Sequence, residues 1–274
     1  MSVSLFEFVD HNAIKITVTL SDGTNEFGSG FFFQYTFLEN KSATVIVTNI
    51  HVVERAVSAS FRITTTDDQN KPDHNDIKDI TITDIQNWVI PHPEKNIDLC
   101  IIPIAKIFSE LEKLGKEPYF APLREHNIPD YNDTEIYKPT EDIYMAGFPN
   151  GLADDLHNLP LVRRGITATP FFIKHNGSPE FIIDCACFTG SSGSPIMIVN
   201  ESSYALHKQP LQQGNRLKLL GILYAGPLYD AQGIVYKKNV PTINTTITNI
   251  PMNLGYCIQS DKILDFKPII ESRM

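Results

Sequence analysis

The chain has 274 residues, and its 42% hydrophobic content is enough to build a sizeable core. Its formal charge of −9 argues against a nucleic-acid backbone or an anionic membrane surface as the main partner. No stretch has the ~18 consecutive apolar residues of a membrane helix, and residues 1–10 lack the basic start of a secretory signal. We therefore expect a cytoplasmic protein.

Short runs rich in β-branched and aromatic residues, bounded by Gly, Asn, Asp and Pro, follow one another along most of the chain. This pattern predicts an all-β barrel or sandwich rather than strand–helix–strand units. The expected strands, in chain order, are residues 13–20, 30–37, 43–50, 58–65, 77–85, 99–104, 143–148, 165–172, 181–187, 195–199, 217–224 and 254–258.

Helical periodicity is rare and is confined to two places. Residues 105–114 place Ile107, Leu111 and Leu114 on one face, and a closing helix is expected over residues 260–272. Ser260 can cap this closing helix, and Pro268 can kink it or end it early.

The domain organisation is indicated by a polar segment rich in proline, residues 117–141. We interpret this segment as a linker between an N-terminal half, residues 1–116, and a C-terminal half, residues 142–274. Residues 67–79 and 227–248 are expected to be long polar loops within these halves.

The four cysteines are interpreted as small core residues. Cys185 and Cys187 are two residues apart, and Cys100 and Cys257 each stand alone, so no ligand set with metal-site spacing is present. The sequence predicts neither a metal nor another cofactor.

Three segments carry residues suited to acyl transfer. A β-branched strand ends at His51, Asp98 opens an apolar run, and a later strand enters a Gly-Ser-Ser-Gly-Ser-Pro turn at residues 190–195 that contains Ser192. Each segment alone has an ordinary structural interpretation. Together they offer the hydroxyl nucleophile, the base and the orienting carboxylate that acyl transfer requires. The order His, Asp, Ser is the chymotrypsin order.

With these motifs the sequence resembles the chymotrypsin-like, trypsin-fold serine peptidases, and most of all the peptidase domain of the bacterial HtrA/Deg-like branch without a PDZ domain. The resemblance implies two antiparallel six-stranded β-barrels with a C-terminal helix. His and Asp come from the first barrel, and Ser comes from the second. The resemblance to this family rests on seven segments: Gly28-Ser-Gly30, Thr48-Asn-Ile-His51, Asn96-Ile-Asp98-Leu, Ala146–Gly151, Arg164–Ala168, Gly190–Pro195 and Asn253–Ile258.

The resemblance implies a catalytic triad of His51, Asp98 and Ser192, and an oxyanion hole made by the N–H groups of Gly190 and Ser192. Ser192 fits the nucleophile position because it lies two residues after one glycine and one residue before another. Ser194 departs from the family's second glycine. The resemblance also assigns substrate-binding positions to Ala186, Thr189, Tyr224, Ala225 and Gly226.

None of these pocket residues is charged, which favours an apolar or small uncharged residue before the cleaved bond. If the register were shifted by two residues, Asp184 would lie in the pocket and favour Arg or Lys. Ser191 occupies the place where secreted relatives carry the Asp that receives a freshly cut N-terminus. We therefore expect no activation of the zymogen type.

The resulting prediction is a serine endopeptidase that acts on protein or peptide substrates. Two alternatives stay open: a catalytically silent binding or scaffold protein of the same fold, and an esterase-like acyl hydrolase. The sequence identifies no regulatory protein partner.

Overall fold

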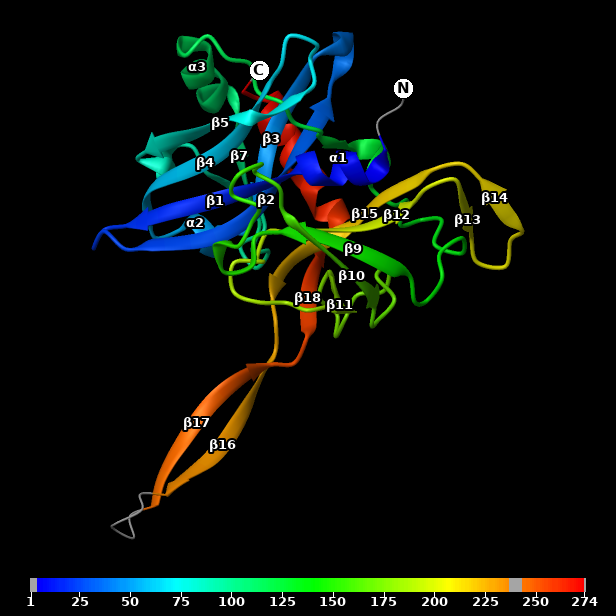
Figure 1. The fold of residues 1–274 in the computed structure, drawn as a ribbon. Coiled ribbons are helices and arrows are strands. Elements are labelled where there is room, and N and C mark those ends of the chain that lie inside the picture. Colours follow the sequence, from blue (N-terminus) through cyan, green and yellow to red (C-terminus); the bar gives the residue numbers. More distant parts are fainter. Residues whose placement is uncertain (1–3, 237–242, 274) are drawn as a thin grey trace.

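The computed structural model describes residues 4–236 and 243–273. Figure 1 shows a sheet built from the N-terminal half, a barrel built from the C-terminal half, and a long hairpin that extends away from the barrel. The helices are short and are α1 (Leu5–Asn12), α2 (Ile50–Val53), α3 (Ala105–Lys113) and α4 (Lys267–Glu271).

The N-terminal half forms a sheet in the order β5-β4-β1-β2-β3-β7-β6, and β8, which lies inside the predicted linker 117–141, adds an eighth strand by pairing with β2. Within the described residues no ladder joins the two edge strands, so a closed first barrel is not confirmed. The edge strand β6 has only two residues and offers little backbone for closure. The strands are β1 (Ala13–Leu20), β2 (Asn25–Thr36), β3 (Ser42–Thr48), β4 (Ala56–Thr66), β5 (Pro72–Thr83), β6 (Ile90–Pro91), β7 (Cys100–Pro103) and β8 (Leu123–Arg124).

The C-terminal half forms a closed six-stranded barrel in the order β10-β11-β18-β15-β12-β9, as the resemblance implied. Its neighbouring strands all pair antiparallel. The strands are β9 (Asp142–Gly147), β10 (Leu161–Thr167), β11 (Glu180–Asp184), β12 (Pro195–Asn200), β15 (Arg216–Ala225) and β18 (Leu254–Gln259). Two separate hairpins consist of β13 (Ser203–Ala205) with β14 (Leu211–Gln213), and β16 (Leu228–Tyr236) with β17 (Ile243–Pro251).

Two predicted loops contain strands. Strand β5 begins inside residues 67–79, and β16 and β17 lie largely inside residues 227–248. The second error has a clear cause: Thr-rich stretches look polar, but Thr is β-branched and favours strands. The closing helix lies where it was expected but is divided into a 3₁₀ segment, Ser260–Phe266, and the short α4, which has Pro268 in its first turn.

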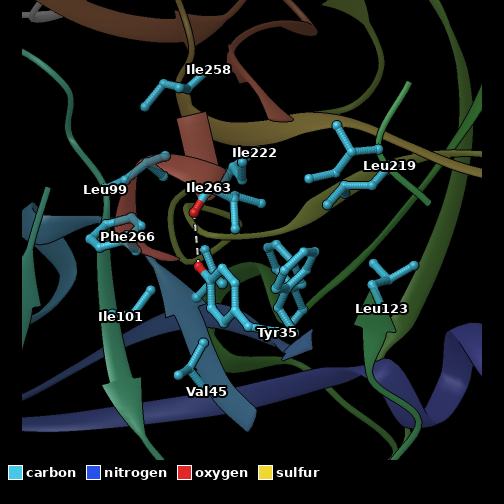
Figure 2. Close-up of a cluster of buried hydrophobic side chains, with 14 of the residues drawn as sticks. Tyr35, Val45, Leu99, Ile101, Leu123, Leu219, Ile222, Ile258, Ile263 and Phe266 are labelled. Atoms are coloured by element: carbon cyan, nitrogen blue, oxygen red, sulfur yellow. Dashed lines mark hydrogen bonds between the residues drawn. The ribbon is translucent and has the colours of Figure 1, made fainter. Parts of the chain in front are cut away.

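One hydrophobic core joins the two halves of the chain (Figure 2). Tyr35 and Val45 come from the N-terminal sheet, whereas Leu219 and Ile222 come from the barrel. The Tyr35 hydroxyl donates a hydrogen bond of 2.8 Å to the carbonyl of Ile263 in the C-terminal segment. Val47 of β3 and Met197 of β12 belong to this core, and an apolar interior packs as tightly as a crystal, so the core holds the two strands in a fixed relation.

Candidate active site

His51 and Asp98 form a close pair at the end of the N-terminal sheet. The His51 ring lies with Nδ1 2.5 Å from Asp98 Oδ2, and the His51 backbone N–H donates to Oδ1 at 3.1 Å. An ionised carboxylate only accepts hydrogen bonds, so this contact places the imidazole proton on Nδ1. Nε2 is then free to accept a proton.

Neighbouring residues hold this pair in position. Asn49, fully buried between β3 and α2, donates its side-chain amide to the Asp98 carbonyl at 2.7 Å. Thr48 pairs in register with Cys100, which places Asp98 just before β7 and beside the start of α2. His51 lies on the first turn of α2.

The Ser192 loop is held by Ser29 of β2, across the interface between the halves. Ser29 N–H donates to the Ser192 carbonyl at 2.9 Å, and Ser29 Oγ donates to the Gly190 carbonyl at 2.8 Å. Ser29 Oγ also accepts from Phe148 N–H at 2.9 Å. Sequence reasoning did not assign this function to Ser29, although the Gly28-Ser-Gly30 motif marked the position.

The peptide before Gly190 is oriented by a second contact. The Thr189 carbonyl accepts a hydrogen bond of 2.6 Å from Asn150 N–H. Because C=O and N–H point in opposite directions across a trans peptide, the Gly190 N–H points away from Asn150. Among the described residues, neither Gly190 N–H nor Ser192 N–H donates a hydrogen bond to the protein. Both donors are free to bind an oxygen atom.

His51 and Ser192 line the same cleft, of about 630 Å³. The Ser192 hydroxyl donates to the Tyr224 carbonyl at 3.4 Å. Within the described part of the chain it forms no hydrogen bond with His51. The structure thus brings the imidazole and the hydroxyl to one cleft without joining them directly.

The predicted pocket residues divide into two groups. Thr189, Ala225 and Gly226 line the cleft, whereas Ala186 and Tyr224 are not among the described residues that line it. The Ala186 carbonyl accepts a hydrogen bond from Arg163, and the Tyr224 hydroxyl donates to Glu180. Other residues that take part in the lining were not assigned to the site from the sequence: Cys187, Phe188, Pro227 and Leu228. Leu223 also lines the cleft.

Asp184, which a register shifted by two residues would place in the pocket, is also not among the described residues that line the cleft. Asp184 ends β11 and borders a separate surface hollow together with Ala186. Glu26 carries the one carboxylate in the described cleft lining, which contains no lysine or arginine. The inner wall near Thr189 and Ala225 is therefore uncharged.

Arg163 of β10 supports the loop that leads to Ser192. One guanidinium nitrogen donates to the Ala186 carbonyl, and the other donates to Ser191 Oγ at 3.3 Å. The guanidinium carbon lies 5.6 Å from the centre of the Phe188 ring, a cation–π distance. Burial lowers the pKa of Arg163, but a guanidinium stays charged in proteins. Arg163 thus ties together both ends of the segment that precedes the serine.

Residues 4–236 and 243–273 contain no group of three or more His, Cys, Asp or Glu side chains placed to hold a metal ion. In the same ranges, the helices are too short or too polar to cross a bilayer.

The closed six-stranded barrel and the sheet beside it define the trypsin-like fold class. The chain belongs to the trypsin-like peptidase domain family, whose model matches residues 28–202, well over half of the sequence. The sequence-based prediction of a trypsin-like serine peptidase is confirmed at this level. No curated protein matches the chain.

Several solved structures are similar to the chain at low sequence identity. An HtrA-type protease, AlgW, in a structure with a decapeptide, is 12% identical, with a TM-score of 0.51 over 99% of this chain and 68% of that chain. The Rv3671c protease from M. tuberculosis is 13% identical, with a TM-score of 0.45 over 93% and 79%. An inactivated protease paralogue from the scabies mite is 12% identical, with a TM-score of 0.47 over 97% and 98%.

Proposed function

We propose that the protein is a serine endopeptidase that hydrolyses peptide bonds in protein or peptide substrates, with Ser192, His51 and Asp98 as its triad. The observation that carries this proposal is the His51–Asp98 pair, in which His51 Nδ1 lies 2.5 Å from Asp98 Oδ2. His51 lines the same cleft as Ser192. A carboxylate in this position fixes the imidazole tautomer that can accept the proton of the serine.

The proposed reaction begins when Ser192 Oγ turns from the Tyr224 carbonyl towards His51 Nε2. The oxygen attacks the substrate carbonyl while His51 takes its proton, and the charged imidazole is stabilised by Asp98. His51 then gives the proton to the leaving amine, and an acyl-enzyme forms on Ser192. Water, activated by the same histidine, releases the acid product.

The free N–H groups of Gly190 and Ser192 are the proposed oxyanion hole. The peptide that carries the Gly190 N–H is held by Asn150 N–H at the Thr189 carbonyl, and the peptide that carries the Ser192 N–H is held by Ser194 N–H at the Ser191 carbonyl, 3.0 Å. Ser29 holds the carbonyls of Gly190 and Ser192 themselves and so fixes the loop around both donors. Donors fixed in advance stabilise the tetrahedral oxyanion more than mobile donors do, because no reorganisation is needed during the reaction.

The uncharged wall near the serine supports a preference for an apolar or small uncharged residue before the cleaved bond. Cys187 and Leu223 lie in this lining together with Thr189, and all three are neutral side chains. An apolar pocket discriminates weakly between similar side chains, so we propose a class of residue and not a single one.

The catalytically silent alternative is favoured by one observation, the hydrogen bond from Ser192 Oγ to the Tyr224 carbonyl. If this arrangement persisted with substrate bound, the hydroxyl would not reach the base. Labelling of the serine separates the two proposals.

A fluorophosphonate probe is expected to label the native protein at Ser192 and to leave the Ser192→Ala variant unlabelled. The reagent reacts only with a hydroxyl activated by a neighbouring base. Mass spectrometry of the modified peptide identifies the residue. Ser194→Ala is the matched control, because Ser194 Oγ is buried without a hydrogen-bond partner among the described residues. Absence of labelling in a folded native protein would support the silent alternative.

Arg163 is proposed to take over the positioning that a new N-terminus provides in zymogen-activated relatives. It contacts Ser191, where those relatives carry an aspartate, and so orders the serine loop without chain cleavage. The Arg163→Ala variant is expected to lose about 10- to 100-fold in kcat, with a smaller change in KM, because a loop shifted by about 1 Å misplaces the nucleophile.

The control for this variant is Arg164→Ala. Arg164 is the next residue on β10, but its side chain is exposed and pairs with Asp142 at 3.1 Å. Its activity on the same peptide should match that of the native protein. Arg163→Lys keeps the charge but not the planar fork, so it should recover only part of the rate. Equal rates for Arg163→Ala and Arg164→Ala would contradict a positioning role.

A further inference from the structure

The strands β15 and β16 form one nearly continuous line of backbone, joined by Gly226 and Pro227. One edge of this line is occupied along both strands. Strand β18 pairs with β15 from Gly221 to Ala225, and β17 pairs with β16 from Leu228 to Tyr236. Because β17 leads directly into β18, both partners lie on the same edge.

Along its opposite edge, β15 first pairs with β12 and then contacts the loop that carries Ser192. Strand β12 pairs with β15 as far as Ile222. The Ser192 loop takes the next positions, since Gly193 N–H donates to the Leu223 carbonyl at 2.8 Å and Ser192 Oγ to the Tyr224 carbonyl at 3.4 Å.

Past the serine loop this edge borders the cleft. Four consecutive residues, from Ala225 to Leu228, line it. Strand β16 then leaves the barrel as part of the projecting hairpin (Figure 1), and within the described residues its only strand partner is β17. The edge that borders the cleft therefore continues into an edge of β16 that has no partner strand in the part of the chain described here.

We propose that this edge of β16 is a docking strand for the extended segment of a polypeptide substrate on the N-terminal side of the cleaved bond. The inference rests on the proposed peptidase function. A chain that lies antiparallel to β15, with its reacting carbonyl at Ser192, runs towards its own N-terminus past Gly226 and Leu228. The nine residues of β16 lie in its path.

Antiparallel pairing is the arrangement that this barrel uses throughout, and it is the more stable of the two. Pro227 has no N–H, so pairing is interrupted there, but β16 contains no proline and can offer alternate N–H and C=O groups along its length. A two-stranded ribbon is marginally stable in water, and a third strand from the substrate stabilises it.

Strand addition of this kind takes its affinity from main-chain hydrogen bonds, which an extended segment of any sequence without proline can form. The substrate class is therefore an unfolded polypeptide with a long extended segment before the cleavage site. A folded protein with the same local sequence in a short loop is excluded, because its backbone cannot lie along β16. Proline within the paired segment is also disfavoured, since it removes a ladder hydrogen bond.

The test compares peptides that share one cleavage site and differ in extension. An N-terminal extension of about ten residues, enough to run along β16, is expected to raise kcat/KM about tenfold or more, whereas the same extension on the C-terminal side gives no comparable gain. A variant in which residues 229–250 are replaced by an Asn-Gly turn should cleave the short peptide normally and lose the gain for the long one.

N-methylation of alternate peptide residues provides a measurement on the native protein, in case the shortened variant does not fold. Methyl groups at every second backbone nitrogen should remove the gain, and methyl groups on the intervening residues should spare it. Equal kcat/KM for short and N-terminally extended peptides would overturn the proposal, and so would a gain that the N-methylated peptides retain in both patterns.

Binding to the Ser192→Ala variant, followed by fluorescence anisotropy of labelled peptides, separates this proposal from the peptidase function. Tighter binding of the N-terminally extended peptide supports the docking strand even if the native protein cleaves nothing. Cleavage of the short peptide, with no dependence of either rate or affinity on extension, retains the peptidase and refutes the docking strand.

Discussion

An Asp98→Asn variant is expected to keep its fold and to lose about 10⁴-fold in kcat on a peptide substrate, the size of effect known for the corresponding change in another serine peptidase. The Asp98 carboxylate accepts two hydrogen bonds, from the His51 ring at 2.5 Å and from the His51 backbone at 3.1 Å. An amide can present its NH₂ group to the ring, which then carries its proton on Nε2 and cannot accept one from Ser192.

The measurement is kcat for one peptide at neutral pH, together with a thermal unfolding curve to verify the fold. Asp184→Asn is the matched control, because Asp184 is a carboxylate outside the lining of the cleft. This control should keep its rate and its preference before the cleaved bond. A folded Asp98→Asn variant with native kcat would show that the carboxylate does not orient the base.

The residues of the candidate triad that the sequence singles out belong to local motifs. His51 follows a β-branched strand, Asp98 opens an apolar run, and Ser192 lies between two glycines. Such motifs are readable because each one encodes its own backbone geometry: both Gly190 and Gly193 adopt positive φ, of 85° and 88°. The strand periodicity similarly located β1 with correct ends.

The supporting contacts could not be predicted, since they join residues far apart in the chain. Ser29 and Gly190 are 161 positions apart, and Arg163 and Ser191 are 28 apart on different elements. Nothing in the local pattern around Arg163 distinguishes it from the exposed Arg164 beside it. The difference arises only when β10 closes the barrel and turns one of the two side chains towards the serine loop.

The lining of the cleft differs in part from the predicted pocket positions for a related reason. Counting six residues back from Ser192 gave Ala186, but counting does not show which side of an irregular segment faces the cleft. The segment after β11 leaves the sheet at Asp184, so strict alternation ends there. Cys187 then lines the cleft, and the Ala186 carbonyl turns to Arg163.

Replacing Gly193 with Ala is expected to lower kcat/KM by roughly 10³-fold and to destabilise the fold by about 2–4 kcal/mol. A Cβ on Gly193 would lie 1.9 Å from the Ser29 carbonyl oxygen and 2.6 Å from Thr48 Oγ1. These neighbours cannot move aside easily, since Thr48 Oγ1 donates to that same carbonyl at 2.7 Å. The serine loop must move instead, which displaces Ser192 Oγ and its N–H together.

Gly177→Ala separates this steric effect from the cost of the backbone conformation. Gly177 has a φ of 86°, close to the 88° of Gly193, but a Cβ there would meet nothing within 4 Å. It should lose only about 1 kcal/mol of stability and none of the activity. Peptide hydrolysis and thermal unfolding of the two variants provide the comparison. If Gly193→Ala were as active as Gly177→Ala, close packing of Ser29 against the serine loop would not be what holds the nucleophile in place.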